Sequence, residues 1–355
     1  MIAHVIVDRL DVPIVLAPLA GGPATPRLAA AVSSAGGLGF LAGGYLSPDA
    51  LRDQIATARA MTTAPLGVNL FVPGVPAGAG SVEAYAGRLA AAAAQADVEL
   101  GHPRFDDDGW DAKLALVTAD PLPVTSFTFG CPDPSVIRAL QEAGSEAWVT
   151  VTNPAEARQA AAVGADALVV QGSEAGGHRA SFDDDEAADS GGFGLLSLLQ
   201  LVRRETRLAL VGAGGVSTGA GVAAVLAAGA SAAQLGTAFL RSPEAGTAQV
   251  HRDAVAAPGP TAMTRAFTGR LARGIRNQFL DEHSQHAPAA YPEVHFLTAQ
   301  LRAAGRRAGN KDLVNLWAGQ THELATDLPA AELVVLLAAD ARTALAAAAG
   351  RLSPA

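Results

Sequence analysis

Short apolar runs alternate with alanine-rich segments between residue 13 and about residue 240. Eight of these runs have the length and composition of strands that are buried on both faces. They are residues 14–17, 38–42, 66–71, 124–129, 147–151, 167–171, 208–212 and 232–236. Strands that alternate with helical segments are typical of βα units around a parallel sheet. Eight units favour a TIM (β/α)8 barrel, an α/β fold, although an open doubly wound sheet has the same periodicity.

Four of the intervening helices have a recognisable first turn. In each, a side chain that can accept a backbone hydrogen bond comes directly before a proline, whose missing N–H needs no partner at the first helical position. The four pairs are Thr25 with Pro26, Ser47 with Pro48, Asp133 with Pro134, and Asn153 with Pro154. We therefore expect helices to begin at these prolines.

The alternation is interrupted twice before residue 240. Residues 101–120 contain three consecutive aspartates, Asp106 to Asp108, and form an excursion before the fourth predicted strand. Residues 183–189, with the sequence DDDEAAD, are expected to form a solvated acidic loop. Consecutive acidic side chains splay apart and lack the spacing of a calcium loop, so we predict no metal site.

After residue 240 the segments become longer, helical and rich in alanine and arginine, with breaks at Pro258, Pro260, Pro288 and Pro292. We predict a barrel domain over residues 1–240 and a smaller, mainly helical lid over residues 241–309. The apolar sequence LVNLWAGQ at 313–320 and the alanine- and leucine-rich end of the chain suggest that residues 310–355 return to the barrel and finish in an outer helix.

The composition excludes several classes of protein. Half of the 355 residues are hydrophobic and 17% are charged, which is enough apolar surface for a large core. A net charge of −9 with scattered basic residues argues against a nucleic-acid partner. Cys131 is the single cysteine, so an intramolecular disulfide is excluded. We find no secretory signal and no uncharged apolar stretch of about 18 residues, so we expect a cytoplasmic protein without a membrane anchor.

The segment LVVQGSEAGGHR, at 168–179, runs from a predicted strand into a turn with two glycines. Gln171 ends the strand, and Gly176 and Gly177 allow the backbone to approach a ligand closely. His178 follows, and its ordinary pKa of about 6.5 suits proton transfer or anion binding at neutral pH. This arrangement favours a catalytic histidine, although a turn histidine that caps backbone groups has the same pattern.

Two further glycine-rich turns follow the last two predicted strands, LVGAGGVST at 210–218 and QLGTAFL at 234–240. Backbone N–H groups of Gly214, Gly215, Gly236 and Thr237 could hold a phosphate at helix N-termini. Barrels of this kind usually bind phosphate after strands seven and eight. Either turn alone could reflect tight packing, but together they predict a cofactor that carries a phosphate.

The ends of other predicted strands have residues that suit the binding of a planar cofactor ring. The sequence APLAGG at 17–22, which includes Ala20 and Gly21, leaves the backbone free to lie against one. Asn69 and Gln171 offer amides whose donors and acceptors match the pyrimidine edge of a flavin, although each could equally satisfy a local hydrogen bond. The chain contains no early GxGxxG, Walker A or GxSxG motif. A lone cysteine such as Cys131 is more often packing than a reactive thiol.

The combination of APLAGG, GVNLF, SFTFG, QGSEAGGHR, VGAGGVS, QLGTAFL and AGQ resembles the nitronate monooxygenase family from residue 13 to about residue 320. The resemblance implies a TIM barrel with a smaller second domain, non-covalent FMN and His178 as the catalytic residue. Tyr291 matches a pocket tyrosine, although a surface anchor for the lid is the alternative. We assign FMN contacts to Ala20, Gly21, Asn69, Gln171, Gly176, Gly177, Gly214, Gly215, Gln234, Leu235, Gly236 and Thr237.

The implied reaction is oxidation of an alkyl nitronate, such as propionate 3-nitronate, by O2 through a flavin semiquinone, giving a carbonyl product and nitrite or nitrate. The expected partners are therefore small molecules, with a homodimer as a possible assembly. One departure is Ala180, where family members commonly have glycine after the arginine. Two alternatives remain, namely an NAD(P)H-dependent flavin reductase of quinones or enoyl thioesters, and a barrel that binds a phosphorylated metabolite without flavin.

Overall fold

The computed structural model describes residues 5–184 and 192–352. Its central element is a parallel sheet of eight strands in the order β1-β9-β8-β6-β5-β4-β3-β2. The strands are β1 (Ile14–Leu16), β2 (Gly39–Ala42), β3 (Leu66–Phe71), β4 (Val124–Thr128), β5 (Glu146–Val151), β6 (Ala167–Gln171), β8 (Ala209–Ala213) and β9 (Ala232–Leu235). A parallel bridge between Val15 and Leu38 joins the two end strands. The predicted eight-stranded barrel is therefore confirmed, and the open sheet is excluded.

Alternate residues of each strand face the inside of the barrel and the surrounding helices. One buried cluster contains Phe40, Trp148 and Val211, and the rings of Phe40 and Trp148 lie 5.8 Å apart. Leu41 and Val149, which neighbour two of these residues in sequence, belong to the larger cluster between the sheet and the helices. Both faces of the strands are therefore buried, which explains why their sequences are continuous apolar runs.

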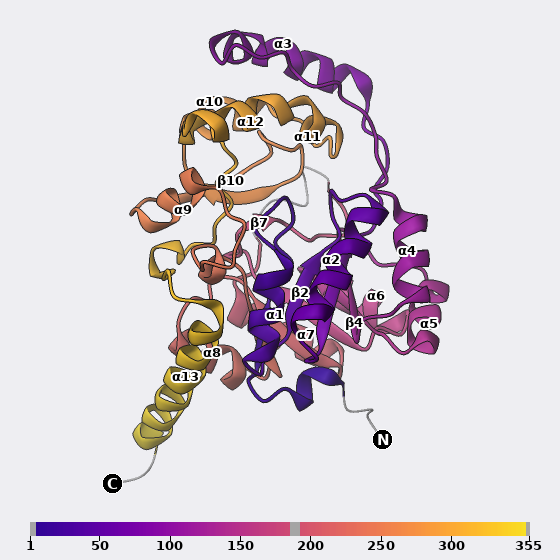
Figure 1. Ribbon diagram of the computed structural model, residues 1–355, viewed down its shortest axis with the longest axis vertical. Coiled ribbons are helices and arrows are strands. Elements are labelled where there is room, and N and C mark those ends of the chain that lie inside the picture. Colours follow the sequence, from indigo (N-terminus) through magenta and orange to yellow (C-terminus); the bar gives the residue numbers. More distant parts are fainter. Residues whose placement is uncertain (1–4, 185–191, 353–355) are drawn as a thin grey trace.

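Helices surround the barrel (Figure 1). They are α1 (Pro26–Ser34), α2 (Pro48–Met61), α4 (Trp110–Ala119), α5 (Pro134–Ala143), α6 (Pro154–Ala162), α7 (Leu195–Glu205), α8 (Gly219–Ala227) and α13 (Ala330–Leu352). All four helix starts predicted at proline are confirmed. Side chains of Thr25, Ser47 and Asn153 cap their helices, whereas Asp133 makes no such bond.

A second layer covers the end of the barrel where the strands have their carboxyl ends; we call it the cap. It contains α9 (Gln249–Ala256), α10 (Gln278–His283), α11 (Glu293–Leu297) and α12 (Ala299–Ala308). It also contains an antiparallel sheet of β10 (Thr261–Thr264), β11 (Ala272–Ile275) and β7 (Gly177–His178). Helices thus dominate this part, but the sequence did not predict its sheet.

Helix α3 (Ala79–Gln95) lies against the cap, far from the other helices that follow early strands (Figure 1). Its residues Val82, Tyr85 and Leu89 share a buried cluster with Phe267 and Phe279. A segment that precedes β4 in sequence therefore contributes to the core of the cap. The domain boundary at residue 240 stays a prediction.

The C-terminal helix α13 packs its buried residues Leu333, Val334 and Leu337 into the barrel's outer cluster. Its far end projects from the body (Figure 1). Among the residues that the structure describes, α13 alone has the length and mean hydropathy, 1.6, to span a membrane. A partly buried helix of a folded domain can have the same length and hydropathy, so these two properties are weak evidence for a membrane span.

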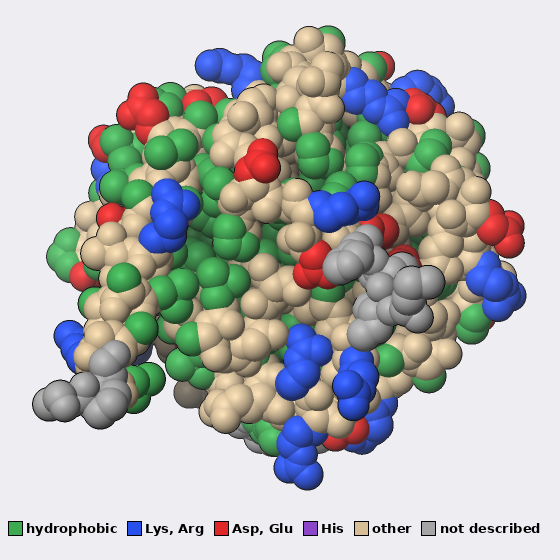
Figure 2. All heavy atoms as spheres, turned by 90° about the horizontal axis from the view of Figure 1, so that it is seen from below, with side chains coloured by type: hydrophobic (Ala, Val, Ile, Leu, Met, Phe, Trp, Pro, Cys, Tyr) green, Lys and Arg blue, Asp and Glu red, His purple; other side chains and the backbone are tan. Residues whose placement is uncertain are grey.

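Seen from below, hydrophobic surface separates scattered charged side chains (Figure 2).

The packing of β2 against α1 gives a test of the fold. A Cβ atom on Gly39 would lie 1.9 Å from the carbonyl oxygen of Ala29, which is a backbone atom of α1. We expect Gly39→Ala to lower the free energy of unfolding by about 1–3 kcal/mol or more, because the helix must move away. Chemical denaturation measures this loss.

Gly87→Ala is the matched control, because Gly87 lies exposed within α3 with no heavy atom within 4 Å of an added Cβ. Alanine in place of glycine inside a helix should raise stability by up to about 1 kcal/mol. Equal stability of the Gly39→Ala variant and the unaltered protein would contradict the packing described here.

Candidate active site

A cavity of about 650 Å³ lies between the carboxyl ends of the barrel strands and the cap. Asn69, Gln171 and Gln234, which come from three different strands, line it from the barrel. His295 and Arg302 line it from the cap. TIM-barrel enzymes have their active sites at this end of the barrel, so the cavity is the candidate active site.

His178 is held in this cavity by a short piece of sheet. Strand β7 pairs antiparallel with β11 of the cap, with His178 opposite Ala272. The preceding residue, Gly177, has a φ of +76°, which favours glycine and turns the chain from the barrel into the strand. The turn with two glycines therefore delivers His178 to the cavity wall, as the sequence predicted.

The surroundings of the His178 ring are aromatic and cationic. Phe129, Tyr291 and Trp317 have ring centroids 5.5–5.7 Å from it. Burial lowers the pKa of His178 to about 3, and the positive charges of nearby arginines act in the same direction. The ring is therefore neutral at physiological pH.

Hydrogen bonding indicates which ring nitrogen carries the proton. Nε2 of His178 lies 2.8 Å from Oγ1 of Thr268. The Thr268 hydroxyl has one proton, which it donates to the carbonyl oxygen of Arg270 at 3.3 Å. We infer that Nε2–H donates to Thr268 and that Nδ1 keeps its lone pair. Within residues 5–184 and 192–352, no hydrogen bond is made to Nδ1.

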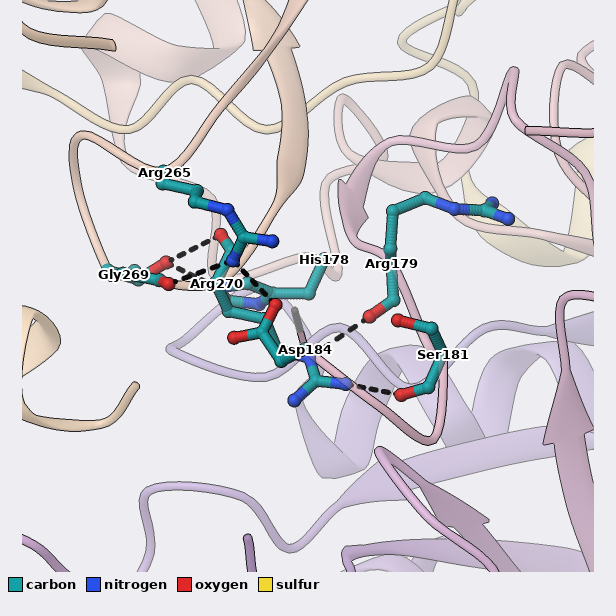
Figure 3. Close-up of polar contacts among 8 residues, drawn as sticks. His178, Arg179, Ser181, Asp184, Arg265, Gly269 and Arg270 are labelled. Carbon is teal, nitrogen blue, oxygen red and sulfur yellow. Dashed lines mark hydrogen bonds and ion pairs between the residues drawn. The ribbon is translucent and has the colours of Figure 1, made fainter. Parts of the chain in front are cut away.

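Arginines of the cap hold the loop that follows His178 (Figure 3). Arg270 donates to the carbonyl oxygens of Arg179 and Ser181, and its guanidinium lies 4.2 Å from the centroid of Phe129. Arg265 forms an ion pair of 2.6 Å with Asp184, whose side chain is 18% exposed. In the segment expected to be a solvated acidic loop, Asp183 is exposed as expected, whereas for Asp184 the expectation is wrong because Arg265 binds it. Residues 185–191 lie outside the described part of the chain.

The Gln171 side chain supports the histidine loop. Its Nε2 donates to the carbonyl oxygen of His178 at 3.0 Å, and its Oε1 accepts bonds from Arg179 and from the backbone of Ala180. One N–H of the amide stays available to a ligand. The flavin contact assigned to Gln171 stays a prediction, and that hydrogen is what the side chain can offer.

Two other side-chain amides that line the cavity, those of Asn69 and Gln234, have oxygen atoms that can accept a hydrogen bond from a ligand. The amide nitrogen of Asn69 donates to Ser126 and Thr128, both at 2.9 Å, so its oxygen is the atom left for a ligand. Gln234 Oε1 is buried without a hydrogen-bond partner. Because a buried acceptor that lacks a donor costs free energy, Gln234 suits a cofactor that carries N–H groups.

Glycines bring the backbone close to the cavity. Gly214 and Gly215 have φ values of +122° and +66°, after β8. A Cβ on Gly176 would lie 2.4 Å from the backbone of Ala318, in the segment that returns from the cap. The N–H of Gly319 donates to Oγ1 of Thr237 at 2.9 Å. Residues of the segment 313–320 therefore contact the turns after β6 and β9 and line one side of the cavity, while the domain assignment of residues 310–355 stays a prediction.

The cavity brings together most of the residues assigned from the sequence. Those that line it are Ala20, Gly21, Asn69, Gln171, Gly176, Gly177, His178, Gly214, Gly215, Gln234, Gly236 and Thr237. Leu235 instead packs in the core between sheet and helices. Tyr291 does not line the cavity; it contacts His178 and donates a hydrogen bond to the hydroxyl of Tyr45. The roles assigned to Leu235 and Tyr291 stay predictions.

The cavity-wall residues that sequence reasoning missed include Tyr45, His295 and Arg302. The rings of Tyr45 and His295 stack with centroids 4.3 Å apart. Arg302 is buried, and it donates to Thr298 and to the carbonyl oxygen of His295. These residues come from the turn after β2 and from the cap helices, where no local motif marks a cavity.

Comparison with known proteins agrees with this geometry. The family profile described as nitronate monooxygenase matches residues 5–340. A nitronate monooxygenase of Paraburkholderia phytofirmans is 40% identical over 341 residues, covering 92% of each chain. The crystal structure of nitroalkane oxidase from Streptomyces ansochromogenes is 50% identical, covers 97% of this chain and 99% of its own, and has a TM-score of 0.95.

A more distant similarity exists to the structure of FabK from Thermotoga maritima, with 25% identity, coverage of 98% of both chains and a TM-score of 0.76. The match to the nitronate monooxygenase profile extends over the barrel, the cap and the first part of α13. The chain belongs to the nitronate monooxygenase family of oxidoreductases.

Proposed function

We propose that this protein oxidises alkyl nitronates with O2, using bound FMN and His178. The observation that carries the proposal is a neutral histidine, fixed by β7, in a cavity whose barrel side combines glycine-rich turns with unused amide acceptors. The family is flavin-dependent in general. We further propose, from the sequence, a cytoplasmic location; a homodimer also stays a prediction.

The residues present fit FMN. Backbone N–H groups of Gly214, Gly215, Gly236 and Thr237 would hold its phosphate, since they lie at the turns after β8 and β9. The unpartnered Oε1 of Gln234 and the free oxygen of Asn69 would accept from the ring's N–H groups. When bound, FMN would supply the electron transfer between substrate and O2 that side chains cannot perform.

His178 would act as the general base that accepts the α proton of the substrate. With a neutral nitroalkane, the lone pair on Nδ1 can take the α proton while the C–H electron pair stays on the substrate as the nitronate. Arg270 and Arg302 act electrostatically on the ring, and their positive charges would stabilise the anion. An anion bound close to the imidazole would raise its pKa above about 3, which favours acceptance of the proton.

The first test is the anaerobic visible spectrum of the purified protein. We expect a flavin spectrum that changes when propionate 3-nitronate is added without any other reductant. A parallel sample receives NADH instead. A change with NADH alone would replace the proposal with a flavin reductase, and absence of flavin absorbance would overturn both.

A second prediction concerns His178→Asn. Turnover of a neutral nitroalkane should fall by about 10²- to 10⁴-fold, because a positioned general base contributes that much. FMN content should stay unchanged, since the cofactor would be held mainly by other residues. The control is His286→Asn, because His286 is exposed in the cap. Unchanged turnover in His178→Asn, measured with O2 consumption, would exclude the catalytic role.

A third prediction uses the pH dependence of stability. Burial lowers the pKa of His251 from 6.5 to about 4. Above pH 6.5 this histidine is neutral in both states and its contribution is complete. As the pH falls toward 4, the unfolded chain binds the proton first, so the free energy of unfolding should decrease by roughly 1.4 kcal/mol per pH unit for this group.

Chemical denaturation at several pH values between 7 and 4.5 would measure this slope. His178 has the same sign of shift and adds to it. In His251→Asn the slope should be smaller by the contribution of one group, whatever the stability at pH 7. A slope that is identical with and without His251 would show that this group does not resist protonation in the folded state.

A further inference from the structure

The turn that follows β2 places a tyrosine over the cavity. Tyr45 has a φ of +67°, a left-handed conformation that residues other than glycine seldom adopt. Its ring lines the cavity and stacks on His295 of the cap, with an angle of 2° between the planes. Its edge also contacts Phe71, at 5.4 Å between centroids. Tyr45 is therefore a barrel residue that reaches the cap across the candidate active site.

A largely buried ion pair binds two backbone groups of this turn. Nζ of Lys113 lies 2.7 Å from Asp108, and the two side chains are 2% and 20% exposed. Lys113 also donates to the carbonyl oxygen of Gly43 at 2.9 Å. The second oxygen of Asp108 accepts from the N–H of Tyr45 at 2.8 Å. One ion pair thus binds the carbonyl of Gly43, which begins the turn, and the N–H of Tyr45 within it, and it holds Tyr45 in its unusual conformation.

The hydroxyl group of Tyr45 can donate a hydrogen bond to a ligand. Tyr291 donates to it, with 3.1 Å between the two oxygens. The proton of Tyr45 itself has no acceptor in the part of the chain that the structure describes. Burial raises the pKa of Tyr45 to about 12, so the hydroxyl stays protonated. The same wall of the cavity contains the buried cation Arg302, with no carboxylate bound to it among the described residues.

We propose that Tyr45 donates a hydrogen bond to an oxygen of the nitronate, and that Asp108 and Lys113 are positioning residues for it. This inference rests on the proposed function, because the anion it binds is the substrate of that reaction. The geometry points to an anion because the donor lies beside a cation and no Asp or Glu of residues 5–184 and 192–352 lines the cavity. The excursion at residues 101–120 thereby acquires a role in substrate binding.

Tyr45→Phe removes the hydroxyl and keeps the ring that stacks on His295. Isobutyrate, an unreactive carboxylate with the same heavy-atom connectivity as propane-2-nitronate, is the binding probe, and calorimetry gives its Kd. We expect the Kd of isobutyrate and the KM of propane-2-nitronate to rise roughly 10- to 100-fold, as for a lost hydrogen bond to a charged group. The kcat should change little, because the bond is present before and during the reaction.

The matched control is Tyr85→Phe. Tyr85 is buried in the cap, and its hydroxyl donates to the carbonyl oxygen of Ala266 at 2.8 Å, away from the cavity. Its loss should leave both constants unchanged. If isobutyrate binds Tyr45→Phe as tightly as it binds the unaltered protein, or binds neither, the contact with Tyr45 is wrong. If isobutyrate shows the expected difference but no nitronate is oxidised, the proposed function fails and the anion contact stands.

A double-mutant cycle tests the positioning residues. Asp108→Asn removes the charge that pairs with Lys113 and should raise the KM several-fold in the unaltered background. In the Tyr45→Phe background the same change should have no further effect, because Asp108 acts through Tyr45. Asp120→Asn, which alters an exposed ion pair with Arg59, is the control. If Asp108→Asn does not fold, Lys113→Arg takes its place. Equal effects in both backgrounds would overturn the positioning role.

Discussion

The pairing of β7 with β11 determines the arrangement of the site. It is short, since only Gly177 and His178 take part, yet it joins the loop after β6 to the cap at the proposed catalytic residue. The N–H of Arg179 extends the contact by donating to the carbonyl oxygen of Leu271 at 2.8 Å. Arg270 donates to the carbonyl oxygens of Arg179 and Ser181. Any shift of the cap relative to the barrel would therefore move the His178 ring. The cap is part of the geometry proposed for catalysis as well as a cover for the barrel.

Positive charge and neutral imidazoles on the cavity wall fit together electrostatically. Arg270 and Arg302 are buried, and burial lowers the pKa of both. Their charges oppose protonation of His178, which burial already disfavours. The result is a wall that contains the cation Arg302 and an unprotonated imidazole, with a second cation, Arg270, packed on Phe129 of the wall, in a protein whose net charge is −9. Such a wall attracts an anion locally and leaves the imidazole free to accept a proton, which suits the proposed removal of the α proton from a neutral nitroalkane and the binding of the nitronate that results.

The sequence predicted what depends on neighbours along the chain. Strands, proline-led helices and glycine turns have local signals, and the turn of Gly176 and Gly177 predicted the place of His178. Tyr45 could not be found in this way, because its position depends on Asp108, 63 residues away. The partners of Gln171 were also hidden: the sequence suggested an amide for the flavin, whereas most of its hydrogen bonds hold the loop of His178.

The same contacts explain why the departure at Ala180 is tolerated. Ala180 is fully buried, and it is not among the residues with positive φ, so the position does not require glycine. Its N–H donates to Oε1 of Gln171 at 3.0 Å, a bond that any residue except proline can make. The loop takes its shape from Gln171 on the barrel side and Arg270 on the cap side. Because neither contact involves the side chain at position 180, a methyl group there leaves the His178 ring where β7 holds it.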